Sequence, residues 1–269
     1  MSAKTLPSLL DKMWHDYVTI NPLAQKVHDL FTGRGDEVLN DHIALRTFND
    51  PRVNIKVMAA PFVASGYKYG GEYFFKEKKL YAHHYEHADA TLPKIFISEL
   101  KLEECSAVLN NTVKDLLAQI PAGKTAEFDF CSVGIPWKKV TKATYETLYK
   151  ETEYAAWVAA FGYRPNHFTV FINALKSFQD IHQLNTFLKE KGIKLNGSGG
   201  EVKGTPDVFL EQSSTMANNI EVQFADGPMT IPACYYEFAK RYVAPNGQLY
   251  QGFVAASADK IFESTHKGQ

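Results

Sequence analysis

The spacing of apolar and polar residues along the chain predicts helices and short strands in alternation. Two segments with helical spacing, 6–20 and 22–32, are separated at Asn21-Pro22. Residues 40–50, NDHIALRTFND, instead form a short apolar run between two Asn-Asp turn signals, which is typical of a strand. A predicted helix at about 53–65 follows, and then three segments rich in aromatic and β-branched residues, YKYGGEYFF, LYAHHYEH and KIFISEL. The resulting order is β, α, β, β, β.

The same order of elements returns in the second half of the chain. Helical patterns at 102–119 and 141–161, with FDFCSVGIPW as a candidate strand between them, lead into NHFTVFIN and an amphipathic helix at 177–192. The segments DVFLEQSS, NIEVQFADG and ACYYEFAKRY complete the second set. The halves agree in element order rather than in residue identity, so coincidence is the alternative to an internal repeat.

Length and composition fit one large packed domain. The 269 residues are 45% apolar and 13% aromatic, which is enough for a sizeable core. We expect an α+β fold in which two βαβββ modules form a curved mixed sheet or open barrel, with additional helices outside. The predicted organisation is one domain over 1–269, with modules at 37–100 and 164–242, helical segments at 1–36 and 101–163, and a closing segment at 243–269.

Charge and cysteine content narrow the function classes. Lys and Arg (29) nearly balance Asp and Glu (30), and no basic block argues for nucleic acid or a membrane surface, so a small anionic or neutral ligand is expected. The N-terminus lacks the apolar core of a signal peptide, and no apolar run is long enough to cross a membrane, which predicts a cytoplasmic protein. Cys105, Cys131 and Cys234 form no CxxC pair and are interpreted as reduced core residues.

The strand at 40–50 carries unexpected polar residues. In a strand, His42, Ala44 and Arg46 share one face while the intervening apolar residues share the other. Because His and Arg are rarely buried without a partner, their face is expected to line a polar cavity. The alternative is an amphipathic edge strand whose polar face lies in water.

Three residues from separate strands suggest a metal site. His167 begins the first strand of the second half, as His42 does in the first half, and Glu237 shares a strand face with Tyr235 and Arg241. Two histidines and one carboxylate form the facial set that binds a divalent metal, commonly Fe(II), and leaves positions open for ligands. The competing interpretation is a structural Glu237 paired with Lys240 or Arg241.

Other ionisable residues offer alternative ligands. By element order, Glu99 in KIFISEL is predicted to be the first-half equivalent of Glu237, which makes it the main rival third ligand. His83, His84 and His87 are clustered near a turn, where solvated histidines at the mouth of a pocket are expected more often than ligands. Zn, Mn and Ni remain alternatives to iron.

Several motifs together resemble one enzyme family. DHIALRTF, KIFISEL, NHFTVFIN, QSSTMA, YYEFAKRY and GFVAASADKIFEST are similar to the 2-oxoadipate dioxygenase/decarboxylase family, a branch of the vicinal oxygen chelate fold. The resemblance implies Fe(II) held by His42, His167 and Glu237, and Arg46 holding a substrate carboxylate. It also implies conversion of 2-oxoadipate and O2 to 2-hydroxyglutarate and CO2 in lysine catabolism.

Further substrate contacts follow from the same interpretation. Gln212 and Ser214 lie at a strand that would face the cavity, and Val254 and Ser257 lie in a terminal segment that would close it. A metal-dependent hydrolase or isomerase on the same scaffold, or a ligand-binding module without chemistry, are the alternative functions. Substrate chain length, product stereochemistry and oligomeric state stay open.

Overall fold

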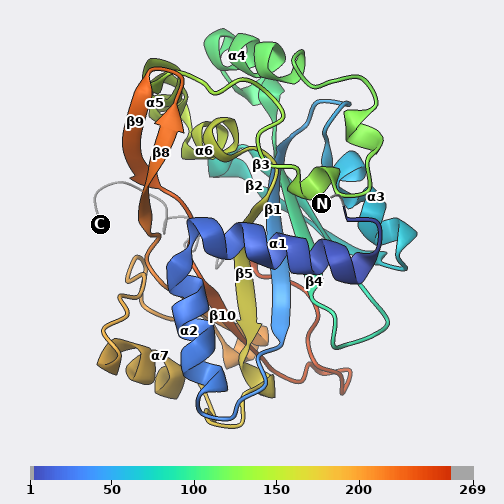
Figure 1. The fold of residues 1–269 in the computed structure, drawn as a ribbon. Helices are drawn as coiled ribbons and strands as arrows, with labels where there is room; N and C mark the ends of the chain where they lie inside the picture. The colour runs from blue at the N-terminus through green and yellow to red at the C-terminus, as the bar shows by residue number, and fades with distance from the viewer. Residues whose placement is uncertain (1–2, 256–269) are drawn as a thin grey trace.

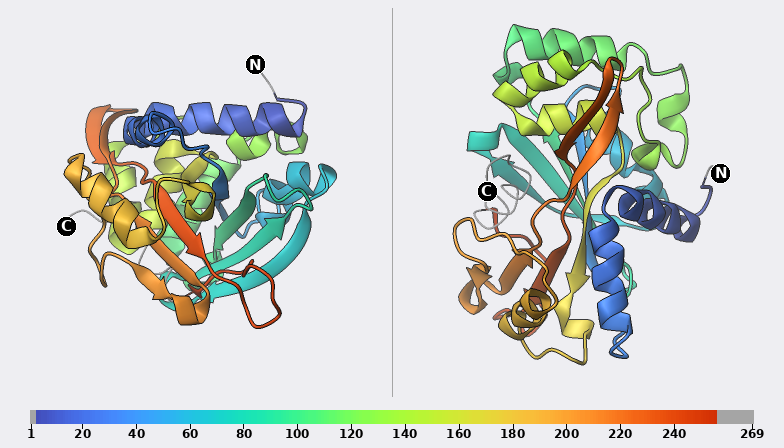
Figure 2. Two further views of the ribbon diagram at one scale, coloured as in Figure 1. Left: turned by 90° about the horizontal axis from the view of Figure 1, so that it is seen from below. Right: turned by 60° about the vertical axis from the view of Figure 1, so that its left-hand side comes forward.

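Eight strands form one mixed sheet in the order β2-β3-β4-β1-β5-β10-β7-β6 (Figure 1). The structure is a computed structural model, and it describes residues 3–255. The strands of this sheet are β1 (Asn40–Phe48), β2 (Lys68–Phe75), β3 (Leu80–Glu86), β4 (Lys94–Leu100), β5 (Pro165–Phe171), β6 (Lys203–Thr205), β7 (Leu210–Ser214) and β10 (Glu237–Arg241). The sheet curls into a half-barrel, as the left view of Figure 2 shows.

The sheet is built from two halves that meet at its centre. β1 and β5 are antiparallel to each other there. Moving outward, the first half continues with β4 parallel, then β3 and β2 antiparallel. The second half continues in the same way with β10 parallel, then β7 and β6 antiparallel. The predicted α+β fold with two related modules in one curved sheet is therefore confirmed, while the exact module boundaries stay a prediction.

The strand prediction for NIEVQFADG is confirmed but its expected place in the large sheet is not, and the strand prediction for FDFCSVGIPW is wrong. The segment NIEVQFADG forms β8 (Asn219–Phe224), which pairs with β9 (Gly227–Pro232) in a separate hairpin rather than joining the large sheet. Gly227 adopts a φ of 115° at the turn, a conformation that favours glycine. FDFCSVGIPW contains a short 3-10 helix at Phe130–Ser132 instead of a strand.

The helices cover both faces of the sheet. The predicted helix at 141–161 is two helices, because Thr152 leaves the helical conformation and caps the second one. The seven α-helices among residues 3–255 are α1 (Leu6–Ile20), α2 (Pro22–Thr32), α3 (Ile55–Ala64), α4 (Ala107–Leu117), α5 (Lys142–Glu151), α6 (Glu153–Phe161) and α7 (Ile181–Glu190). No helix in this part of the chain has both the length and the apolar character needed to cross a bilayer.

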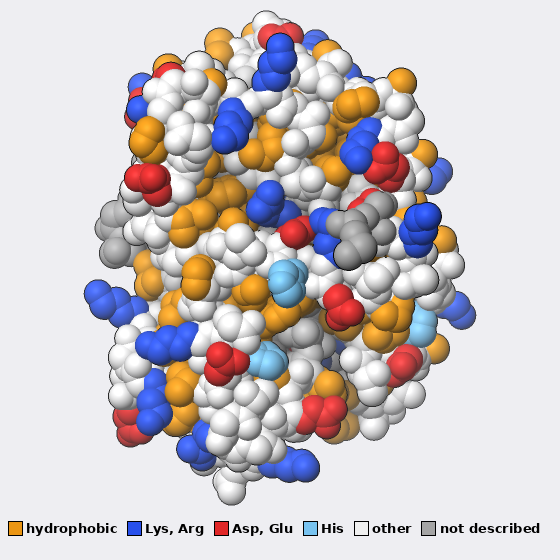
Figure 3. Space-filling model, viewed as in Figure 1, with side chains coloured by type: hydrophobic (Ala, Val, Ile, Leu, Met, Phe, Trp, Pro, Cys, Tyr) orange, Lys and Arg blue, Asp and Glu red, His pale blue; other side chains and the backbone are white. Residues whose placement is uncertain are grey.

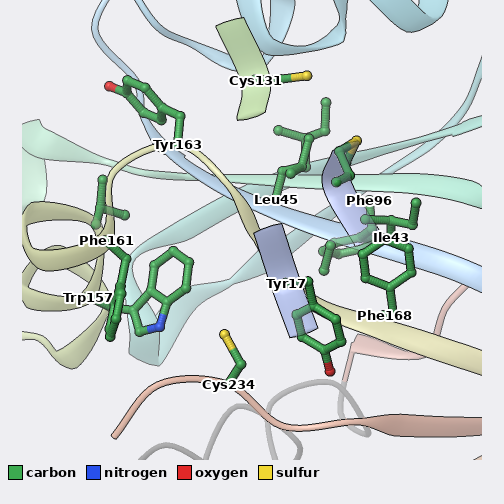
Figure 4. Packing of buried hydrophobic residues seen from close by; sticks show 14 of the residues in the cluster. Tyr17, Ile43, Leu45, Phe96, Cys131, Trp157, Phe161, Tyr163, Phe168 and Cys234 are labelled. Carbon is green, nitrogen blue, oxygen red and sulfur yellow. The ribbon is translucent and has the colours of Figure 1, made fainter. Parts of the chain in front are cut away.

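The apolar core lies mainly on the face of the sheet that α1 covers. Tyr17 of α1 packs with its ring centroid 5.1 Å from that of Phe168 on β5. Figure 4 shows these rings together with Ile43 and Leu45 of β1. The alternate residues of β1 and β5 point the other way, into the half-barrel. On the face shown in Figure 3, charged side chains of both signs are interspersed rather than gathered into one patch.

Candidate metal centre

Strand pairing brings three predicted ligands together. Thr169 of β5 lies opposite His42 of β1 on one side and opposite Glu237 of β10 on the other. His167 Nε2 lies 3.3 Å from Glu237 Oε2, and His42 Nε2 lies 3.7 Å from Glu237 Oε1. One ligand atom from each of the three residues falls within 4.8 Å of the others, and all three side chains are buried.

The imidazoles are oriented for ligation through Nε2. The His42 Nδ1–H donates to the carboxylate of Asp41 (2.8 Å), and the His167 Nδ1–H donates to the amide oxygen of Asn166 (3.1 Å). Such outer contacts fix the ring and leave the Nε2 lone pair for a cation. Burial lowers the pKa of both histidines, so they are neutral. For His42 the Asp41 carboxylate opposes the pKa shift, whereas for His167 the neighbouring His42 and Arg46 add to it.

The carboxylate completes a donor set suited to a divalent metal. Burial raises the pKa of Glu237 to about 8, although the hydrogen bond from Gln212 opposes the shift. Gln212 Nε2 lies 2.5 Å from Glu237 Oε1 and orients the carboxylate. A bound cation would favour the deprotonated form of Glu237. Two neutral imidazoles and one carboxylate converging in a buried site then fit a transition metal bound through three protein ligands, with positions left for other molecules.

A buried ion pair supports the first histidine, and no pattern in the sequence pointed to it directly. Arg241 donates from Nε and Nη2 to the two oxygens of Asp41, at 2.5 and 2.8 Å. Burial by itself would raise the pKa of Asp41, but Arg241 and His42 hold it well below its usual range. The interpretation of Glu237 as a structural partner of Arg241 is therefore not what the structure shows, because Asp41 pairs with that guanidinium.

Arg46 lies on the same strand face as His42 and is almost fully buried, at 2% exposure. Its Nη1 is 2.8 Å from Oε1 of Glu153, and its guanidinium lies over the rings of Tyr154 (4.9 Å) and Trp157 (5.2 Å) of α6. β1 is a central strand, so the alternative of a solvated edge strand is wrong. A cavity of about 290 Å³ adjoins Arg46 and is lined by lysines and glutamates of the turn between β2 and β3 and of α5 and α6.

Glu99 is not the counterpart of Glu237. In the first module, Ala44 follows His42 by two residues and lies opposite Phe96 of β4. In the second module, Thr169 follows His167 by two residues and lies opposite Glu237 of β10. The first-module counterpart of Glu237 is therefore Phe96. Glu99 Oε2 instead accepts from the backbone N–H of Ile55 (2.9 Å) at the start of α3, which satisfies an otherwise free helical N–H.

The three clustered histidines have partners other than a metal site. His84 is buried and contacts Tyr73 Oη (2.9 Å) and Glu86 Oε1 (2.7 Å). His83 Nε2 lies 2.7 Å from the Tyr81 hydroxyl, and His87 Nδ1 accepts from the Asp89 backbone. Within residues 3–255, the group able to hold a metal comprises His42, His167 and Glu237 alone.

Of the other predicted substrate contacts, some lie next to the candidate metal ligands and others do not. Gln212 contacts the candidate ligand Glu237, and Ser214 is the buried residue opposite Glu237 in β7. Val254 is partly exposed. It follows Phe253, whose ring centroid lies 4.8 Å from that of His42. Ser257 falls outside the described residues. Their roles in binding substrate stay predictions.

The fold is that of the vicinal oxygen chelate class, and the site has the donor set of a metal centre. A Ralstonia eutropha protein, named provisionally as a glyoxalase-superfamily member and 20% identical, has the same fold with a TM-score of 0.75, covering 91% of this chain and 84% of that one. The family model for 2-oxoadipate dioxygenase/decarboxylase matches residues 9–127 and 131–250. The chain belongs to this enzyme family.

Relatives agree over nearly the whole chain. A curated Arabidopsis thaliana protein, the chloroplastic 2-oxoadipate dioxygenase/decarboxylase, is 37% identical over 97% of this chain and 78% of its own length. The crystal structure of hydroxyglutarate synthase from Oryza sativa with 2-oxoadipate is 32% identical, with a TM-score of 0.90 over 99% of this chain and 96% of that one. A Shewanella frigidimarina protein, named provisionally as a hydrolase, is 50% identical with a TM-score of 0.90, over 95% and 100% respectively.

Proposed function

We propose that this protein is an Fe(II)-dependent dioxygenase that converts 2-oxoadipate and O2 to 2-hydroxyglutarate and CO2. The observation that carries the proposal is the convergence of His42, His167 and Glu237 in a buried site, with the buried Arg46 on the same strand face. Membership of the 2-oxoadipate dioxygenase/decarboxylase family supports the substrate and the reaction. A cytoplasmic location and a place in lysine degradation are further parts of the proposal.

Some residues of the candidate metal centre would bind the metal, and others would orient the residues that bind it. His42, His167 and Glu237 would hold the metal, and Asp41, Asn166 and Gln212 would keep these ligands oriented. Bound Fe(II) supplies the redox chemistry that the reaction of O2 with an organic acid requires. The burial of all three ligands excludes water, which strengthens electrostatic interactions inside the site and protects reactive species from side reactions.

Arg46 would bind the distal carboxylate of the substrate. Its planar guanidinium forms paired, charge-assisted hydrogen bonds with a carboxylate and stays charged when buried. Glu153 holds one edge of the guanidinium, while Tyr154 and Trp157 pack against its face, so the side chain is fixed before substrate binds. A preorganised cation of this kind favours a dicarboxylate over an acid that lacks the second charge.

Oxygen uptake separates this proposal from its alternatives. We would load the purified protein with Fe(II) and record O2 consumption with a panel of 2-oxo acids, using Zn(II)- and Mn(II)-loaded protein for comparison. We expect Fe(II)-dependent uptake that is fastest with 2-oxoadipate. Turnover without O2 would favour the hydrolase or isomerase alternative. The Shewanella relative carries the provisional name of a hydrolase. Retained ligand binding with no metal bound would favour a binding module.

A further inference from the structure

Two neighbouring tyrosines carry buried hydroxyl groups with no hydrogen-bond partner among the described residues. Tyr235 and Tyr236 both have 0% exposure, and Oη of each is unpartnered. A buried hydroxyl without a partner costs stability, because it has lost its hydrogen bonds to water. Where such a hydroxyl also faces a ligand-binding site, a bound ligand can supply the missing partner.

The two side chains point to opposite sides of an extended segment. The ring of Tyr235 stacks on His167, with centroids 4.7 Å apart and an interplanar angle of 26°. The ring of Tyr236 instead packs against Trp14 (6.0 Å) and Phe238 (5.6 Å) in the apolar core. Only Tyr235 therefore faces the interior of the half-barrel, where the metal centre lies.

The Tyr235 side chain lies beside the candidate metal ligands, because its ring stacks on His167. Tyr235 also interacts electrostatically with Glu237 and with Arg46. A tyrosine phenol is ordinarily protonated at neutral pH, so its hydroxyl is available as a hydrogen-bond donor at this place.

We propose that Tyr235 is a substrate-contacting residue that, together with Arg46, selects 2-oxo dicarboxylates by donating its O–H to the distal carboxylate. The inference rests on the proposed function, in which one end of the substrate lies at the metal ligands and the distal carboxylate lies at Arg46. A substrate bound in this way would lie beside Tyr235. Glu153 already occupies one N–H of the Arg46 guanidinium. A carboxylate has about four acceptor positions, so a second donor beside the arginine completes its recognition.

The neighbouring tyrosine provides a matched control. Tyr235→Phe and Tyr236→Phe each remove one buried, unpartnered hydroxyl and keep the ring. For Tyr235→Phe we expect kcat/KM on 2-oxoadipate to fall about 10- to 100-fold, the usual effect of losing a hydrogen bond to a charged group. Activity of the same variant on 2-oxohexanoate, which lacks the distal carboxylate, should be little changed, and Tyr236→Phe should leave both substrates unaffected.

Two further measurements distinguish substrate contact from a structural role. Calorimetry with Ni(II)-loaded protein should show a similar loss of 2-oxoadipate affinity in Tyr235→Phe, and the metal-free variant should be at least as resistant to urea as the wild type. Equal losses on both substrates, equal losses in both variants, or no loss in Tyr235→Phe would each overturn the inference. If the wild type binds 2-oxoadipate without consuming O2, the proposed function fails, while the affinity ratio still tests Tyr235.

Discussion

Replacing Arg46 tests whether recognition of the distal carboxylate is separate from metal binding. Arg46 lies four residue steps along the strand from His42, about 13 Å. A six-carbon diacid and a long arginine side chain can together bridge this distance. Arg46→Lys keeps the charge and loses the paired hydrogen-bond geometry, and Arg46→Ala loses both. Truncating one partner of a desolvated charged pair costs about 2–5 kcal/mol. We expect kcat/KM on 2-oxoadipate to fall by about 30-fold to several thousand-fold in Arg46→Ala, and by less in Arg46→Lys.

The ion pair with Glu153 has to be controlled in this experiment. Glu153 is only 13% exposed, so Arg46→Ala also leaves a mostly buried carboxylate without this cation. Breaking a buried pair in this way lowers the free energy of unfolding by about 3–5 kcal/mol, an upper bound here because Glu153 retains some contact with water. Arg46→Met combined with Glu153→Gln removes both charges and should recover much of the lost stability.

Selectivity is therefore the decisive readout. We would compare kcat/KM for 2-oxoadipate and 2-oxohexanoate in each variant, with iron occupancy held equal. The reasoning predicts a loss confined to 2-oxoadipate, including in the doubly substituted variant. An equal loss on both substrates would refute it, since Arg46 would then support the fold or the metal site, and another group would have to recognise the distal carboxylate.

Three further predictions concern the metal centre. Replacing His42, His167 or Glu237 by Ala should abolish turnover and metal binding but leave the circular dichroism spectrum of the metal-free protein unchanged; a variant that fails to fold would show a structural role for that residue. Saturating metal at about 100 times its Kd should raise the free energy of unfolding of the wild type by about 2.7 kcal/mol. Asp41→Asn or Arg241→Lys should weaken Co(II) affinity about 10- to 100-fold, as measured by calorimetry, and unchanged affinity would show that this buried pair does not position His42.

The sequence predicted those parts of the site that depend on local periodicity. Alternation along residues 40–48 placed His42 and Arg46 on one face, because a central strand with two partners keeps its side-chain period of two. The repeated element order then identified His167, and the parity of the last strand identified Glu237. The pairing of β1 with β5 and of β5 with β10 converts these separate local patterns into one cluster.

Features that depend on strand register were not predictable in this way. Glu99 was matched with Glu237 by element order, but the register of β4 against β1 places Phe96 there. The hairpin of β8 and β9 has a strand-like pattern, and such a pattern does not say which sheet a strand joins. The role of Asp41 was missed because a register shift between Asn40 and His42 interrupts regular pairing, and simple alternation does not describe residues at a bulge.

The most direct test of the proposed function is isotope labelling with ¹⁸O2. Fe(II)-loaded protein would be supplied with 2-oxoadipate under labelled oxygen, and the 2-hydroxyglutarate and CO2 would be analysed by mass spectrometry beside His167→Ala as the control. The account predicts that the 2-hydroxyglutarate from the wild type carries both atoms of O2, one in the new carboxylate and one in the hydroxyl, that the CO2 is unlabelled, and that the variant forms no product. Product without label, or product formed at the same rate without O2, would contradict it.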